Sequence, residues 1–152
     1  MTQSVRIFPG DLAAGFKLSR LSMIDLHKRA YRAQQLDHLE VCGVLVVGED
    51  RMIDLRYVES RSTEPYHYEI CIEDIVAIEN GLCQNSEWIL GTFHSHPVAE
   101  AVPGPGDLEH GFFAGIELIY DVCGREARLW KKETQNGQVD LVSLPIEVST
   151  LE

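Results

Sequence analysis

Two kinds of hydrophobic pattern alternate along the first half of the chain. Between Ser22 and Gln35 apolar residues recur at helical spacing, and Ser22 with Asp25 three residues later is typical of a helix start. The run 41–47 is instead almost continuously apolar and rich in valine, which predicts a strand buried on both faces. Residues 52–58 follow a turn-like Gly-Glu-Asp and are predicted to pair with this strand as a hairpin.

The second half of the chain predicts one helix and several short strands. Apolar residues share one helical face over 73–82, and a strand is predicted over 88–96. Proline and glycine in the next ten residues exclude continuation of that strand. Further strand-like runs cover 115–122, 127–131 and 139–144. The pattern predicts a mixed α/β fold in a single domain spanning residues 1–152.

Charge narrows the classes of partner. The 152 residues include 13 Lys and Arg against 24 Asp and Glu, a net charge of −11. Such a chain repels phosphates and anionic headgroups, so we expect neither nucleic acid nor membrane as a partner. No apolar stretch approaches the roughly 18 residues of a membrane span, and the N-terminal segment lacks a secretory pattern. A cytoplasmic location is therefore expected.

The cysteines are expected to be reduced core residues. They are far apart and form no C-x-x-C pair, and three of them lie in apolar runs, where cysteine acts as a small hydrophobe. They are Cys42, Cys71, Cys83 and Cys123.

Candidate chemistry concentrates between residues 93 and 107. His94 and His96 are one residue apart on a predicted strand, so they project from the same face and can converge on one ion. Asp107 follows a loop of Pro and Gly residues that can fold back, and it is the nearest carboxylate with a reason to be positioned as a third ligand. Three such ligands favour zinc and leave a fourth position for water, as in catalytic zinc sites.

Glu40 is the candidate general base. It immediately precedes the apolar run 41–47, where a charged residue is unexpected unless it lines a cavity. Partial desolvation there raises the pKa of a carboxyl group into the useful range. We therefore expect Glu40 to take a proton from the attacking water.

Together these residues resemble the JAMM (MPN+) zinc metalloproteases, in particular their compact prokaryotic members. The family pattern is a Glu in E-x-x-G, then H-x-H, seven residues and S-x-x-D. Its positions are occupied here by Glu40, Gly43, His94, His96 and Asp107. The resemblance covers about residues 18–132. It implies the cytidine deaminase-like (JAB1/MPN) architecture, a mixed central sheet flanked by helices, with one catalytic Zn²⁺ per chain.

One position departs from the family pattern, because Gly104 stands where the family has serine. The resemblance implies that this serine helps to bind the substrate carbonyl and the water. Loss of one such donor costs about 100- to 1000-fold in turnover in another hydrolase, so reduced activity is expected, with backbone amides of residues 104–106 or a water as partial substitutes. Structurally, Gly104 is an acceptable helix N-cap and Pro105 suits the first helical position.

The function that the resemblance implies is hydrolysis of a peptide or isopeptide bond. The expected substrate is the Gly-Gly tail of a ubiquitin-like or sulfur-carrier protein, or a small peptide. A non-catalytic MPN-type binding module is the alternative, which Gly104 favours. A zinc deaminase is a third hypothesis, since the fold also carries such enzymes, but their complete H-x-E and P-C-x-x-C signature is absent.

Two further histidines are assigned secondary roles. His67, on a predicted strand among aromatic residues, is interpreted as a packing residue or a substrate contact. His110, three residues after Asp107, is a candidate to support the site from behind the ligands.

Overall fold

The structure, a computed structural model, describes residues 5–149, except for the side chains of Glu109 and His110. Its helices are α1 (Arg20–Gln35), α2 (Ile72–Gly81) and α3 (Pro105–His110), with 3-10 turns η1 (Leu12–Ala14) and η2 (Phe113–Gly115). Its strands are β1 (Phe16–Ser19), β2 (Cys42–Gly48), β3 (Met52–Val58), β4 (Glu87–His96), β5 (Ile116–Asp121), β6 (Glu126–Gln135), β7 (Gln138–Leu144) and β8 (Ile146–Ser149). In this described part, no helix has the length and apolar character needed to span a membrane.

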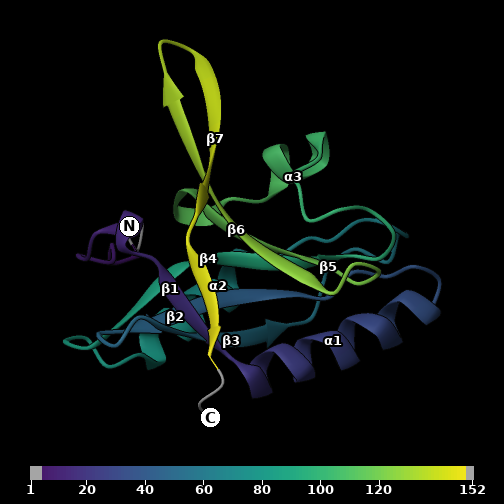
Figure 1. The fold of residues 1–152 in the computed structure, drawn as a ribbon, viewed down its shortest axis with the longest axis horizontal. Helices are drawn as coiled ribbons and strands as arrows, with labels where there is room; N and C mark the ends of the chain where they lie inside the picture. The colour runs from purple at the N-terminus through teal and green to yellow at the C-terminus, as the bar shows by residue number, and fades with distance from the viewer. Residues whose placement is uncertain (1–4, 150–152) are drawn as a thin grey trace.

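The strands form one mixed sheet in the order β7-β6-β5-β4-β2-β3-β1-β8. β2 pairs antiparallel with β3 and β4, whereas β4 pairs parallel with β5. β7 and β8 stand at opposite ends of this order although only Pro145 separates them in the chain, so the sheet must curl strongly. Figure 1 shows β8 running beside β1 and the β6–β7 hairpin projecting beyond the body of the molecule. The predicted mixed α/β fold is confirmed.

The centre of the sheet is covered by one helix on each face. Leu45 and Val47 of β2 belong to the same core cluster as Leu26 of α1, whereas Val44 belongs to a second cluster with Ile75 of α2. Successive β2 residues therefore face opposite helices, as the continuous apolar run predicts. Burial of each such side chain stabilises the fold by about 1.5–3 kcal/mol. This packing fixes the strand whose entrance carries Glu40.

Some predicted boundaries were wrong. Ser19, rather than Ser22, caps α1, because its hydroxyl accepts a hydrogen bond from the Ser22 backbone N–H at 3.0 Å. β1 and β8 were not predicted, since each has four residues and shows too short an alternation to recognise. The cysteines are all free, as expected, but only Cys42 is buried. The core interpretation was wrong for the other three.

Candidate metal centre

The end of β4 presents two histidines on one face of the sheet. β4 is paired with β2 on one side and β5 on the other up to this point, so its backbone is fixed. His94 is fully buried and His96 is 7% exposed. Their Nε2 atoms lie 3.1 Å apart. The predicted convergence of the two imidazoles is therefore present.

The short helix α3 brings Asp107 to these histidines. Gly104 is its N-cap and Pro105 its first residue, as predicted, and the Gly104 backbone N–H donates to Asp107 Oδ2 at 2.8 Å. Asp107 Oδ1 lies 3.0 Å from His94 Nε2, and Oδ2 lies 2.9 Å from His96 Nε2. The aspartate thus spans both imidazoles.

The donor set of this cluster fits a zinc ion. The two Nε2 atoms lie 3.1 Å apart, and each lies 2.9–3.0 Å from a different carboxylate oxygen of Asp107. Tetrahedral zinc with bonds of about 2.0–2.1 Å separates its ligands by about 3.3–3.4 Å, so small outward shifts suffice. Among the described residues, no fourth His, Cys, Asp or Glu joins the group. A zinc ion held by these three residues would keep one coordination position for water or substrate.

Without a cation, the cluster holds protons. Burial disfavours a charged His94, but its hydrogen bonds to Asp107 and Glu117 outweigh this effect and raise the pKa of His94 to about 10. Burial likewise opposes ionisation of Asp107, yet its contacts with both imidazoles keep its pKa well below the ordinary value. A metal ion must displace a proton from this site, so binding releases protons at neutral pH.

Glu40 faces the same cluster from the entrance of β2. The antiparallel register pairs Cys42 with His94, and extending it by two residues places Glu40 opposite His96 on the imidazole face. Ser95 fixes this entrance, because its hydroxyl accepts from the Val41 N–H at 2.9 Å and its own N–H donates to Val41 O at 3.0 Å.

The environment of Glu40 suits a base that works near neutral pH. Its side chain is half-buried, and this desolvation raises the pKa of the carboxyl to about 7, although the charges of His94 and His96 act in the opposite direction. A group with this pKa can accept and return a proton at neutral pH.

Sequence reasoning missed the residues that hold the two imidazoles in place. His94 Nδ1 lies 2.7 Å from Oε2 of the fully buried Glu117, and the ring of Tyr68 stacks on His94. His96 Nδ1 instead donates to the backbone carbonyl of Glu100 at 2.7 Å. The sequence did hold one signal, since Glu117 is a charged residue inside an apolar run, as Glu40 is next to one.

The two histidines that were assigned secondary roles from the sequence have different outcomes. His67 lies in a loop rather than on a strand, and its Nδ1 is 2.6 Å from the Ser62 hydroxyl. It lines the groove that contains Glu40, and its role as a substrate contact stays a prediction. The side chain of His110 lies outside the described residues.

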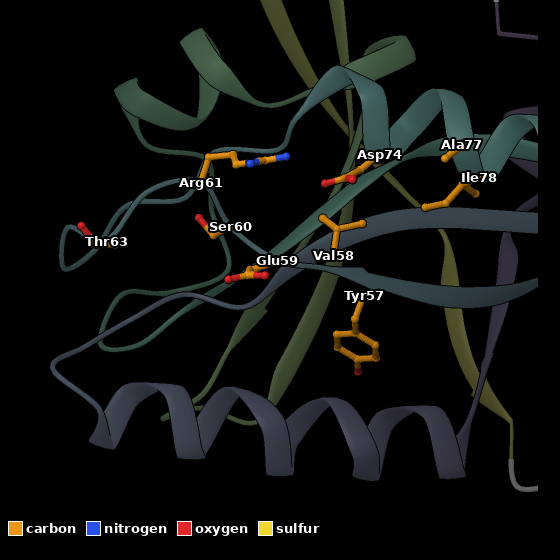
Figure 2. Close-up of a pocket in the computed structure, with 9 residues that line it drawn as sticks. All are labelled: Tyr57, Val58, Glu59, Ser60, Arg61, Thr63, Asp74, Ala77 and Ile78. Carbon is orange, nitrogen blue, oxygen red and sulfur yellow. The ribbon is translucent and has the colours of Figure 1, made fainter.

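A groove of about 410 Å³ opens beside Glu40. It lies between the C-terminal part of α1, the entrance of β2 and the segment that follows β3; its walls include Arg29, Ala33, Leu39, Val41, Tyr57, Ser62 and His67. A second pocket, of about 590 Å³, lies at the end of β3 and contains neither Glu40 nor a residue of the His–His–Asp cluster. Figure 2 shows this pocket, with Tyr57 directed towards α1 and Arg61 towards Asp74 of α2. Neither hollow is lined by a residue of the His–His–Asp cluster, and of the two only the groove contains Glu40.

Comparison with known proteins identifies one family and two relatives with the same name. The family described as prokaryotic homologs of the JAB domain matches residues 25–133. Desampylase from Pyrococcus furiosus is 30% identical over 103 residues, 66% of this chain and 73% of the relative. Desampylase from Haloferax volcanii is 29% identical over 111 residues, 71% of this chain and 78% of the relative.

Two solved structures share the fold. The solution structure of a protein from Desulfitobacterium hafniense has a TM-score of 0.63 and 21% identity, over 88% of this chain and 94% of that one. The crystal structure of a JAB1/MPN domain protein from Archaeoglobus fulgidus has a TM-score of 0.53 and 17% identity, over 88% and 98%. At these identities the likeness concerns the fold alone.

Proposed function

Because the chain belongs to the prokaryotic homologs of the JAB domain, we propose that it is a zinc-dependent peptidase or isopeptidase. In this proposal His94, His96 and Asp107 hold one Zn²⁺ and Glu40 is the general base. The observation that carries it is the convergence of the three ligand atoms beside a desolvated carboxyl group with a pKa of about 7. The two desampylase relatives support a hydrolase of this type.

The proposed substrate is the Gly-Gly tail of a ubiquitin-like or sulfur-carrier protein. The desampylase names of the relatives support this class of substrate. The groove beside Glu40 has a volume within the range of ligand-binding clefts, and its lining mixes apolar residues with polar ones such as Ser62 and His67. In this proposal a tail of small residues lies extended in the groove, with its last carbonyl near Glu40.

The residues of the chain divide the reaction between them. Zinc, when bound, supplies Lewis-acid chemistry, because it polarises the carbonyl oxygen and lowers the pKa of water to about 7. Glu40 accepts a proton from the attacking water and delivers it to the leaving amine. The catalytic water and the scissile carbonyl therefore lie on the face shared by Glu40 and His96.

Gly104 limits what the loop contributes to binding the developing oxyanion. It has no hydroxyl, its backbone N–H already donates to Asp107, and Pro105 has no N–H. Of the three backbone amides expected to substitute for the family serine, only that of Gly106 is left. We expect slow turnover for this reason.

The test combines metal content with cleavage. Zinc per chain is measured by elemental mass spectrometry for the wild type, Glu40→Gln and Asp107→Ala, and each protein is incubated with a tail-extended ubiquitin-like substrate. We expect about one zinc in the wild type and in Glu40→Gln, little in Asp107→Ala, and a loss of cleavage of at least about 100-fold in both variants. Exposed Glu64 supplies the matched control, because Glu64→Gln makes the same chemical change outside the site.

Two results would contradict parts of the proposal. Cleavage by Glu40→Gln at the wild-type rate would remove Glu40 from the mechanism. A wild type that binds zinc and the substrate protein but leaves its tail intact would favour the alternative, a non-catalytic MPN-type binding module, for which Gly104 is the supporting observation.

A further inference from the structure

The most unusual buried group of the described residues is the carboxylate of Glu117. It lies in β5, is fully buried, and pairs with Thr92 across the parallel ladder. Its Oε1 accepts from the Thr92 hydroxyl and from the Phe112 backbone N–H at 2.9 Å. Its Oε2 accepts from His94 Nδ1 at 2.7 Å and from the Tyr68 hydroxyl at 3.3 Å. A buried carboxylate is costly unless its oxygens are satisfied in this way.

This set of partners suits a carboxylate, which offers acceptors only. The Thr92 hydroxyl, the Tyr68 hydroxyl and the Phe112 backbone N–H all donate to Glu117, and the carboxylate has no hydrogen to offer in return. His94 Nδ1 must therefore carry the hydrogen in its contact with Oε2. The other ring nitrogen, Nε2, is then the one available to a cation, and it is the atom that faces Asp107 and His96.

Tyr68 fixes the plane of the same imidazole. Its ring lies over that of His94 with centroids 4.2 Å apart and an angle of 18° between the planes. Its hydroxyl reaches the carboxylate that holds Nδ1, so ring contact and hydrogen bond act from two directions. Tyr68 is 3% exposed, which leaves little room for the imidazole to rotate.

We propose that Glu117 is a positioning residue of the metal centre, which sets the tautomer and the orientation of His94 with Tyr68 as the second constraint. The inference rests on the proposed zinc-dependent function. A histidine held in this way needs no reorientation when the cation arrives. Loss of such a partner in metalloenzymes weakens metal binding by about 10- to 100-fold.

The matched variants separate the two constraints. Glu117→Gln keeps the size of the side chain but replaces one acceptor oxygen by an NH₂ group that must face two donors. Tyr68→Phe keeps the stacked ring and removes only the hydroxyl. We expect a zinc dissociation constant about 10- to 100-fold higher for Glu117→Gln and at most about 3-fold higher for Tyr68→Phe.

The experiment is a competition titration of the metal-free full chain with zinc and a chromophoric chelator. The wild type, Glu117→Gln, Tyr68→Phe and the control Glu64→Gln are compared, and thermal unfolding of each metal-free protein reports its stability. Weaker zinc binding confined to Glu117→Gln supports the inference. A less stable Glu117→Gln protein with the zinc affinity of the wild type would assign Glu117 a structural role only and overturn it.

A second measurement uses the wild type and so does not depend on the folding of a variant. Long-range ¹H–¹⁵N correlation NMR of the zinc-loaded protein identifies which ring nitrogen of His94 carries hydrogen. The expected result is hydrogen on Nδ1 and zinc on Nε2, and the opposite assignment would overturn the inference. A wild type that binds no zinc would overturn both the proposed function and this inference, whereas equal zinc affinity in Glu117→Gln would overturn only the latter.

Discussion

His94 and His96 are two residues apart on one strand, yet different regions of the molecule hold them. Behind His94 stand the buried side chains of Glu117 and Tyr68. Behind His96 stands a backbone carbonyl, that of Glu100, in the irregular loop between β4 and α3. The difference indicates that the His94 half of the site is built into the sheet, whereas the His96 half depends on how that loop is held.

The loop is held by contacts to its carbonyl groups. Trp130 of β6 donates from Nε1 to Ala101 O at 2.9 Å, and Gln34 of α1 donates to Pro97 O at 2.9 Å. Asp107 belongs to the same half, since its position follows from the first turn of α3. These single hydrogen bonds are each worth about 1 kcal/mol, which is less than the buried network around Glu117 is expected to contribute.

The largest expected effect separates the two halves directly. Both His94→Ala and His96→Ala should raise the zinc dissociation constant at least about 1000-fold, because each removes a ligand. In the metal-free protein the two variants should differ. His94→Ala leaves buried Glu117 without its cationic partner and should cost about 3 kcal/mol, whereas His96→Ala should cost about 1 kcal/mol. Urea unfolding in the presence of a chelator measures this contrast. Equal losses of unfolding free energy in the two variants would contradict the view that His94 and His96 are supported differently.

The next largest effect is expected from Glu40→Gln, which should change how the free energy of unfolding depends on pH. Its pKa is about 7 in the folded, metal-free protein and about 4.5 as an ordinary carboxyl, so the folded state binds more protons between these values. The wild type should therefore lose stability relative to Glu40→Gln as pH rises from 4.5 to 7, by up to roughly 3 kcal/mol.

The measurement for Glu40 is chemical unfolding at several pH values in a chelator. Glu64→Gln, at an exposed site, serves as the matched control and should run parallel to the wild type. If the unfolding free energy of Glu40→Gln also changes with pH as that of the wild type does, the segment before β2 does not desolvate the Glu40 carboxyl.

A gain of activity is expected from a substitution in the His96 half of the site, at Gly104. A Cβ added at Gly104 would have Asp107 Oδ2 as its nearest neighbour at 3.7 Å, an ordinary contact, so Gly104→Ser fits and restores the hydroxyl of the family pattern. We expect turnover of a tail-extended ubiquitin-like substrate to rise about 10-fold or more, with zinc content unchanged. Gly106→Ser, two residues further into the same turn, is the control. An equal rise in both variants, or none in Gly104→Ser, would contradict the role assigned to residue 104.

The sequence predicted the His–His–Asp cluster, but it did not predict the residues that hold His94 in place, for a physical reason. His94, His96 and Asp107 follow from strand periodicity and from loop spacing, both of which are local. The contact of His94 with Glu117 depends on the parallel pairing of β4 with β5, which places residues 23 positions apart side by side. That pairing cannot be read from either strand alone.

The same distinction explains the outcomes for the elements. The long apolar run of β2 and the periodic pattern of α1 were recognised, because many residues repeat the signal. β1 and β8 owe their strand conformation to pairing with each other and, for β1, with β3. The start of α1 was misplaced because Ser19 and Ser22 are both suitable caps, and the backbone at Ser19 selects the first.

The smallest expected effect tests whether the loop between β4 and α3 still supports the His96 half of the site when it loses a hydrogen bond. Trp130→Phe removes the donor to Ala101 O, whose residue is 3% exposed, and should cost about 1–2 kcal/mol of stability. Trp88→Phe is the control, because Trp88 packs against Phe8 and, within the described part of the chain, its indole N–H donates no hydrogen bond to the loop. If the loop adapts to the cation, zinc binding in Trp130→Phe should weaken by only about 3-fold. A loss as large as that of Glu117→Gln would mean that loop and sheet constrain the metal centre equally, and the division between the two histidines would fail.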